Sequence, residues 1–181
     1  YTSQYIDDEV KEKEHLIRLS NYDELTAAFN RNAYITKTLE FAESGLPENF
    51  WYMTVDINGL KTVNDNIGHD AGDELIRGAA ECLMAAFGDK GEVYRIGGDE
   101  FVTFVYGSEA DLKGILKKLD KVLEEWNARN TLDLFLSKGY VSPTEIPDSN
   151  LAKISKEADV RMYADKAAFY DAHPELNRRT M

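Results

Sequence analysis

The segment RIGGDEF, at residues 95–101, lies between two runs of strand-forming residues. Aromatic and β-branched side chains, which favour β-strands, lead into it and out of it. Its two central glycines allow the chain to reverse direction between the runs. The sequence therefore predicts a β-hairpin over residues 93–105. A plain turn explains the glycines, but it leaves open why two acids, Asp99 and Glu100, follow them directly.

Helix-like and strand-like patterns share the rest of the chain. In the helix-like segments apolar residues recur every three or four positions, whereas the strand-like segments are short apolar runs. The run at residues 50–55 is apolar on both faces, which is typical of a central strand. The expected helices span residues 5–19, 32–44, 60–67, 70–87, 112–126 and 150–170, and the expected strands are residues 50–55, the two arms of the hairpin, and residues 132–141.

The order of these elements predicts a βαββαβ sheet of the α/β (α+β) class, ferredoxin-like, mainly antiparallel and flanked by helices. The crossover from the first strand to the second should be right-handed, and the tight hairpin pairs the second strand with the third. The spatial order that follows is 4-1-3-2. In that order the end of the first strand, at Asp56, lies beside the hairpin tip, at Asp99.

Charge and apolar content limit the partners of the chain. The formal net charge of −12 argues against nucleic-acid binding, because that affinity comes mostly from lysine and arginine. Uncharged stretches fall far short of the ~20 apolar residues of a membrane span, so we expect no membrane contact. The single cysteine, Cys82, sits in an apolar helical pattern and is interpreted as an inert buried thiol. These features favour a cytoplasmic location.

The chain divides into three expected parts. Residues 1–22 carry a sparse apolar stripe among many charges, which is typical of a surface helix or a short coiled-coil stalk. Residues 23–175 form the expected domain, and residues 176–181 form a tail. Because the chain begins at Tyr1 rather than at methionine, we expect a piece of a longer protein, which upstream sequence could tether to a membrane.

Asp56 and Asp99 raise a problem of charge. Carboxylates at the ends of neighbouring strands, about 5 Å apart by backbone spacing, repel each other unless a positive group lies between them. A divalent metal is the simplest such group. Magnesium accepts one or two carboxylates and completes its coordination with water and phosphate oxygens, as in phosphoryl-transfer sites. A zinc site is not expected, since the three histidines show no ligand spacing.

Four segments, in this order along the chain, resemble the GGDEF domain of bacterial diguanylate cyclases. They are DELTAAFNR (23–31), VDINGLKTVNDNIGHDAGDEL (55–75), RIGGDEF (95–101) and ADVRMYADK (158–166). The resemblance implies a nucleotidyl-cyclase sheet and the joining of two GTP molecules into cyclic di-GMP with release of two pyrophosphates. It also implies a homodimer in which each domain holds one GTP, controlled by an upstream sensory region.

The resemblance assigns the metal site. Asp56 and Asp99 match the carboxylates that bind two Mg²⁺ ions, for which Mn²⁺ could substitute, with help from the backbone carbonyl of Ile57. Such ions lower the pKa of the attacking ribose 3′-hydroxyl and stabilise charge at the α-phosphate. Glu100 is expected beside the metals and to matter for catalysis.

The resemblance also assigns the guanine site. Asp73 matches the carboxylate that accepts from the two adjacent N–H donors of guanine, and Asn64 matches the residue that completes the readout. Gly97 and Gly98 would let the nucleotide approach the backbone closely. Asp70 we interpret as a helix N-cap only.

Two lysines match the positions that contact the triphosphate, Lys61 and Lys166. Without the resemblance each would be interpreted as a solvated surface lysine. The direction of Arg95 stays open, because it could face the nucleotide or decorate a strand. His69 is interpreted as a residue of a helix start rather than a catalytic base.

The chain departs from the family pattern in several places. Asn58 replaces an acid that is not the metal ligand, so we expect turnover to survive, and Ala27–Ala28 alters a turn. Phe169–Tyr170 stands where the family often has glycine and a phosphate-contacting arginine. Glycine at positions 88 and 91 replaces the arginine and aspartate of a product-inhibition site, which predicts that this feedback site is absent.

Two alternatives to an active cyclase follow from the sequence. The first is a catalytically degenerate GGDEF domain that binds GTP and regulates a partner. The second is a related cyclase with another base preference, which Asp73 disfavours because adenine lacks the paired donors that a carboxylate accepts.

Overall fold

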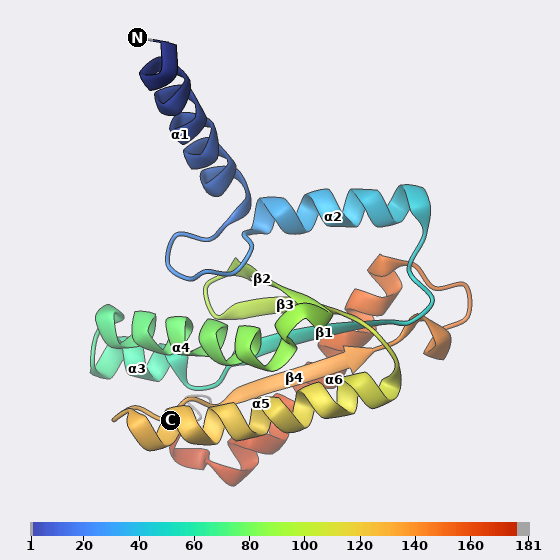
Figure 1. The fold of residues 1–181 in the computed structure, drawn as a ribbon. Helices are drawn as coiled ribbons and strands as arrows, with labels where there is room; N and C mark the ends of the chain where they lie inside the picture. Colours follow the sequence, from blue (N-terminus) through green and yellow to red (C-terminus); the bar gives the residue numbers. More distant parts are fainter. Residues whose placement is uncertain (1, 177–181) are drawn as a thin grey trace.

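The structure is a computed structural model that describes residues 2–176. Of the expected tail, only Leu176 falls within this range, and the rest lies outside the described residues. Figure 1 shows a sheet between helices, with one long helix standing apart. The helices are α1 (Thr2–Asn21), α2 (Arg31–Ser44), α3 (Leu60–Asn66), α4 (His69–Phe87), α5 (Glu109–Arg129) and α6 (Leu151–Ala172); the strands are β1 (Phe50–Ile57), β2 (Gly91–Gly97), β3 (Glu100–Tyr106) and β4 (Leu136–Val141); short 3₁₀ helices cover Gly88–Lys90, Pro143–Glu145 and Pro174–Leu176.

The sheet has the strand order β2-β3-β1-β4, and each neighbouring pair is antiparallel. This order confirms the expected 4-1-3-2 arrangement and the hairpin of β2 and β3. In the register of β1 and β3, Asp56 lies opposite Glu100. The end of β1 and the hairpin tip therefore share one end of the sheet.

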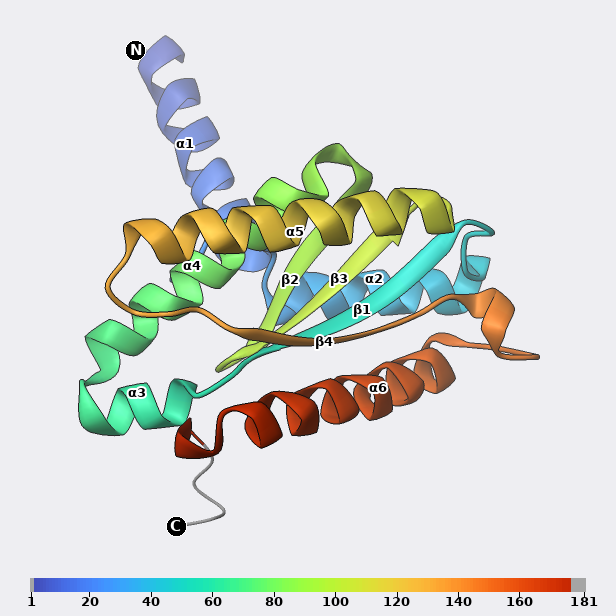
Figure 2. The same ribbon diagram turned by 90° about the horizontal axis from the view of Figure 1, so that it is seen from below.

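Helices cover both faces of the sheet (Figure 2). Alternate residues of β1 supply the two cores, since side chains along a strand point to opposite faces. Met53 and Val55 pack with α4 and α5, whereas Phe50 and Tyr52 pack with α2 and α6. Cys82 is buried in the first core, where burial raises the pKa of its thiol to about 11, as expected of an inert thiol.

The helix α1 projects away from the rest of the chain (Figure 1), and none of its residues is buried. Its exposed apolar side chains include Ile6, Val10 and Ile17. The expected N-terminal helix is thus confirmed, while its use as a stalk stays a prediction. No helix within residues 2–176 combines the length and apolar character that spanning a bilayer requires.

Several boundaries differ from the sequence prediction, and two of the larger differences have a clear local cause. β4 begins at Leu136 rather than at residue 132, because its partner β1 ends at Ile57, opposite Leu136. The segment before it is held instead by Asn127, whose side chain bonds both the N–H and the carbonyl of Leu134. α5 begins at residue 109, three residues earlier than expected, because Ser108 and Asp111 form a capping box.

The start of α4 also differs. The prediction that Asp70 is the N-cap is wrong. Asp70 lies in the first turn of the helix, and Gly68 is the N-cap residue. Gly68 has φ +119°, a conformation that glycine adopts readily, which allows the helix to start at His69. The expectation that His69 belongs to a helix start is confirmed.

The helix α6 lies directly against β4. A Cβ atom on Gly139 would come within 2.1 Å of the carbonyl oxygen of Ala158 and 2.4 Å of the backbone nitrogen of Met162. Glycine at this position therefore sets the close approach of α6 to the sheet. The approach matters for the site, because α6 carries Lys166 and Tyr170.

Candidate active site

The ends of β1 and β3 bring the two predicted aspartates together. Asp56 is the penultimate residue of β1, and Asp99 lies at the hairpin tip, next to the start of β3. The backbone N–H of Ile57 donates to the carbonyl oxygen of Asp99 at 3.2 Å. The expected juxtaposition, which rested on the strand order, is confirmed.

The Asp56 carboxylate is buried but only half satisfied. Its Oδ2 atom accepts a hydrogen bond from Nζ of Lys166 at 2.5 Å, while Oδ1 is buried and has no partner among the described residues. Burial raises the pKa of Asp56 to about 6; Lys166 opposes this shift and the nearby Asp99 carboxylate adds to it. A buried carboxylate oxygen without a partner is costly, so this atom is available to a cation.

Lys166 is the counter-charge in this arrangement. Burial alone would lower the pKa of its ammonium group, but the hydrogen bond and the charge of Asp56 outweigh burial and raise it. Lys166 therefore stays charged and neutralises Asp56.

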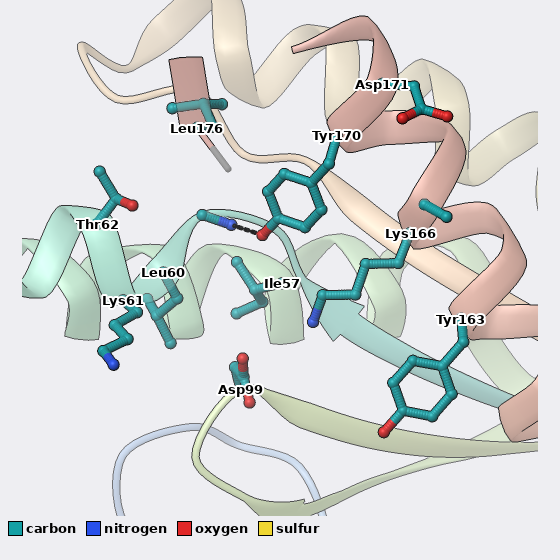
Figure 3. Close-up of a pocket in the computed structure, with 12 residues that line it drawn as sticks. Ile57, Leu60, Lys61, Thr62, Asp99, Tyr163, Lys166, Tyr170, Asp171 and Leu176 are labelled. Atoms are coloured by element: carbon teal, nitrogen blue, oxygen red, sulfur yellow. Dashed lines mark hydrogen bonds between the residues drawn. The ribbon is translucent and has the colours of Figure 1, made fainter. Parts of the chain in front are cut away.

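A cavity of about 560 Å³ opens beside this pair, between the end of β1, α3 and the C-terminal half of α6. Figure 3 shows Lys61, Lys166 and Asp99 around it, with the ring of Tyr170 on the side of α6. Two lysines and two aspartates, Asp99 and Asp171, thus border the same space. The cavity offers cationic groups to an anionic ligand next to a candidate metal site.

The predicted guanine residues lie on α3 and α4, outside the described lining of this cavity. A Cβ atom on Gly72 would fall 1.8 Å from Oδ1 of Asn64, so the Asn64 side chain packs directly on the start of α4. Asp73 is the next residue. The fold therefore brings Asn64 next to the segment that carries Asp73.

The glycines of the hairpin tip are exposed. Gly98 has φ +45°, in the left-handed region that glycine tolerates best. A Cβ atom added to Gly97 or to Gly98 would meet no other part of the described chain within 4 Å, and neither glycine belongs to the described cavity lining. The tip therefore has open space around its backbone.

Glu100 lies on the same face of the sheet as Asp56 but outside the described cavity lining. Burial raises the pKa of its carboxyl group, as do Asp159 and Asp99, while Arg31 opposes the shift. Within residues 2–176, no three His, Cys, Asp or Glu side chains are grouped closely enough to hold a metal ion by themselves. A metal at this place would need backbone, water or phosphate ligands as well.

Asn58 is buried, and its Oδ1 atom accepts a hydrogen bond from Oγ of Ser137 at 2.7 Å. This residue, which replaces an acid of the family pattern, thus binds β4 through its carbonyl oxygen. Gly91 stands at the position of the aspartate of the product-inhibition site. A Cβ atom on Gly91 would lie 2.5 Å from the backbone oxygen of Phe104. The local packing of β2 therefore leaves no room for a side chain at position 91.

Two contacts of the site could not be assigned from the sequence. Arg95, whose direction was left open, bonds both carboxylate oxygens of Asp23 at 3.2 Å and the carbonyl oxygen of Gly98 at 3.0 and 3.2 Å. It braces the hairpin tip rather than lining the cavity. Asp23 also accepts from Thr26, which orders the turn after α1.

The second contact joins Tyr170 to the turn between β1 and α3. The backbone N–H of Gly59 donates to the hydroxyl oxygen of Tyr170 at 3.0 Å (Figure 3). The only sequence signal for this residue was its departure from the family pattern, at the position of an arginine.

The chain is similar to known proteins in sequence and in fold. The family model of the diguanylate cyclase GGDEF domain matches residues 20–170. Among solved structures, the coiled coil and GGDEF domain of DgcB from Caulobacter crescentus, in complex with c-di-GMP, has a TM-score of 0.72 at 22% identity, over 92% of this chain and 91% of that chain. That similarity concerns the fold alone.

Sequence relatives include the signaling protein YkoW of Bacillus subtilis, 33% identical over 86% of this chain and 20% of that protein. The probable diguanylate cyclase DgcI of Escherichia coli is 32% identical over 80% of this chain and 30% of that protein. The cyclic di-GMP phosphodiesterase PdeB of Shewanella oneidensis is 29% identical over 86% of this chain and 18% of that protein. The chain thus spans less than a third of the length of each of these relatives.

Proposed function

Because this chain belongs to the diguanylate cyclase GGDEF domain family, we propose that it joins two molecules of GTP into cyclic di-GMP and releases two molecules of pyrophosphate. The observation that carries the proposal is the buried, unpartnered Oδ1 atom of Asp56, close to Asp99 and next to a cavity bordered by Lys61 and Lys166. Such a set of groups suits a metal-bound polyphosphate.

Magnesium fits the residues present. Asp56 and Asp99 would hold it together with the carbonyl of Ile57, with Glu100 beside them, and Mn²⁺ could substitute. The Asp56 oxygen that lacks a partner supports this fit, since an oxygen ligand of a hard cation must be free to coordinate. The ion would supply Lewis-acid activation of the 3′-hydroxyl and charge stabilisation at the α-phosphate.

The remaining residues would hold the nucleotide. Lys61 and Lys166 would bind the polyphosphate, whose charge the acidic chain could not otherwise accept. Asn64 and Asp73 would read the guanine base, and their placement on adjoining helix surfaces supports a shared site. The open backbone at Gly97 and Gly98 would let the nucleotide approach the hairpin tip.

Lys166 would change partner during binding. Without a ligand it neutralises Asp56, and this keeps a buried carboxylate charged. A cation at Asp56 would remove the need for that contact and leave the ammonium group to bind a phosphate oxygen. The lysine would thus bind Asp56 before the nucleotide binds and a phosphate oxygen afterwards.

Turnover would need two chains. Cyclic di-GMP contains two equivalent phosphodiester bonds, and one site holds one nucleotide, so a twofold pairing of identical half-sites meets the requirement. The projecting helix α1 would connect residues 23–175 to an upstream sensory region and help to pair two chains. We place the reaction in the cytoplasm.

The product assay tests the proposal. Purified protein is incubated with Mg²⁺ and GTP, and the products are separated by chromatography. We expect cyclic di-GMP and pyrophosphate from the wild type, no product from Asp99→Ala, and full product from the control Asp120→Ala, which changes an exposed residue of α5.

The alternative is a domain that binds GTP without turning it over. Two observations support this alternative. Tyr170 replaces an arginine of the family pattern, and one relative is named as a phosphodiesterase. Saturable binding of GTP by the wild type, with no product at any protein concentration, would decide for this alternative.

A further inference from the structure

The C-terminal half of α6 forms one wall of the cavity (Figure 3). Tyr170 and Lys166 are one helical turn apart, so their side chains share a face of the helix. The Tyr170 ring lies next to Lys166, on the side of the cavity opposite Asp99. Its hydroxyl group therefore stands near the lysine assigned above to the polyphosphate.

The hydroxyl group of Tyr170 accepts a hydrogen bond but donates none within the described residues. A tyrosine hydroxyl can accept hydrogen bonds and donate one. The oxygen of Tyr170 accepts from the N–H of Gly59, and no acceptor for its own hydrogen is found within residues 2–176. The bond to Gly59 occupies one side of the oxygen, so the O–H is left to turn toward the cavity that both residues line.

We propose that the Tyr170 hydroxyl donates a hydrogen bond to the polyphosphate of the bound nucleotide and so contributes to affinity for nucleoside triphosphates. The inference rests on the proposed function and adds a ligand-binding residue to the same site. A neutral donor paired with an anionic oxygen makes a short, strong hydrogen bond. Gly59 fixes the position of the oxygen before the nucleotide arrives, which lowers the entropy cost of that contact.

Binding to two ligands separates this role from a structural one. The ligands are GMP and a GTP analogue with a methylene bridge between the α- and β-phosphorus atoms, which cannot release pyrophosphate. Both are titrated by calorimetry into the full chain with saturating Mg²⁺. The variant is Tyr170→Phe, and the control is Tyr140→Phe, whose ring packs against Trp51 and does not line the cavity within the described residues.

For Tyr170→Phe we expect about tenfold weaker binding of the analogue, as for a lost hydrogen bond to a charged group. Binding of GMP should change by less than about twofold on the same grounds, because GMP lacks the β- and γ-phosphates. The Tyr140→Phe control should bind both ligands like the wild type.

Three results would overturn the inference. Equal binding of the analogue by Tyr170→Phe and the wild type would show that the hydroxyl makes no phosphate contact. Equal losses for both ligands, with a lower melting temperature, would show a structural role only. A wild type that binds neither ligand would remove the proposed function itself, and the inference with it.

Discussion

At the scale of single residues, the site depends on how one buried carboxylate is neutralised. One carboxylate oxygen of Asp56 accepts a hydrogen bond from Lys166, and the other has no partner among the described residues. Burial favours the neutral carboxyl group, whereas the ammonium group favours the charged one. Lys166 thus binds one oxygen of a carboxylate that we propose as a cation ligand, and it would compete with the cation for that carboxylate.

This competition gives the first prediction. At a pH well above the pKa of Asp56, where the carboxylate stays ionised without the lysine, Lys166→Gln should bind Mn²⁺ several-fold more tightly than the wild type in the absence of nucleotide, by about 1 kcal/mol, because the competing ion pair is gone. The same variant should bind the GTP analogue more weakly, since it lacks the phosphate-binding charge. Electron paramagnetic resonance of free Mn²⁺ measures the first effect and calorimetry the second.

The matched control is Lys156→Gln, an exposed lysine of the same helix. Unchanged or weaker Mn²⁺ binding by Lys166→Gln, with the control like the wild type, would show that Lys166 does not compete with the cation.

The sequence predicts these residues unevenly. Asp56 and Asp99 follow from the strand order, because each ends or begins a strand and the order makes the strands neighbours. The contacts of Tyr170 with Gly59 and of Arg95 with Asp23 join residues 111 and 72 positions apart. Side-chain contacts over such separations depend on how helices and turns pack on the sheet, which no local pattern encodes.

At the scale of elements, the hairpin of β2 and β3 depends on a brace from outside the sheet. Arg95 ties the carbonyl of Gly98 to Asp23 in the turn after α1. Both side chains of the ion pair are 17% exposed, so the contact is partly shielded from water and salt.

The second prediction concerns this brace. Arg95→Gln should destabilise the fold by about 1–2 kcal/mol, because it removes hydrogen bonds between charged groups. It should also speed amide hydrogen exchange at the hairpin tip. Chemical unfolding and exchange measured by NMR test the two effects.

A matched substitution, Arg18→Gln on the exposed surface of α1, should change neither quantity. If amide hydrogen exchange at the hairpin tip were equally slow in Arg95→Gln and in the wild type, the contact of Arg95 with Asp23 would not order the hairpin.

The third prediction concerns the contact between β4 and α6. Gly139→Ala places a methyl group against backbone atoms of α6, and overpacking of this kind costs about 1–3 kcal/mol. Because α6 must move to relieve the clash, and carries Lys166 and Tyr170, binding of the GTP analogue should weaken as well. Thermal unfolding and calorimetry measure the two changes.

The control is Gly114→Ala on α5, where no atom lies within 4 Å of the added methyl group. This change should leave binding intact and stabilise the helix by up to about 1 kcal/mol. If Gly139→Ala behaved in the same way, the close approach of α6 would not position the site.

The elements themselves were largely predictable, and their ends were less so. Periodicity predicted the central strand, the hairpin and the helices, since burial of one face imposes the pattern. The predicted start of β4 was wrong because the end of its partner β1 sets where β4 begins. The predicted N-cap of α4 was wrong because Gly68 supplies the turn before the helix.

At the scale of the whole molecule, the proposed reaction would need two copies of this domain. We propose one nucleotide site per chain at the cavity next to Asp56 and Asp99, and α1 carries exposed apolar side chains, none of them buried in the described chain. An acidic chain with a net charge of −12 would also repel a polyphosphate, so the proposed binding would depend on the metal and the lysines.

The fourth prediction follows from the need for two half-sites. Specific activity should rise with protein concentration, because the fraction of paired chains rises. A variant without residues 1–20 should need a higher concentration for half of the maximal activity, while its affinity for the GTP analogue stays unchanged. Specific activity that is constant over a thousandfold dilution, in a protein that sediments as a monomer, would contradict the pairing.

We propose that Asp56 and Asp99 share a divalent cation next to a bound guanosine triphosphate. The most direct test of this proposal is a crystal structure of the full chain with Mn²⁺ and the GTP analogue, in which anomalous scattering locates the manganese. We expect a manganese peak bound by both carboxylates, with the guanine at Asn64 and Asp73. A peak elsewhere, or a nucleotide bound away from the end of β1, would contradict it.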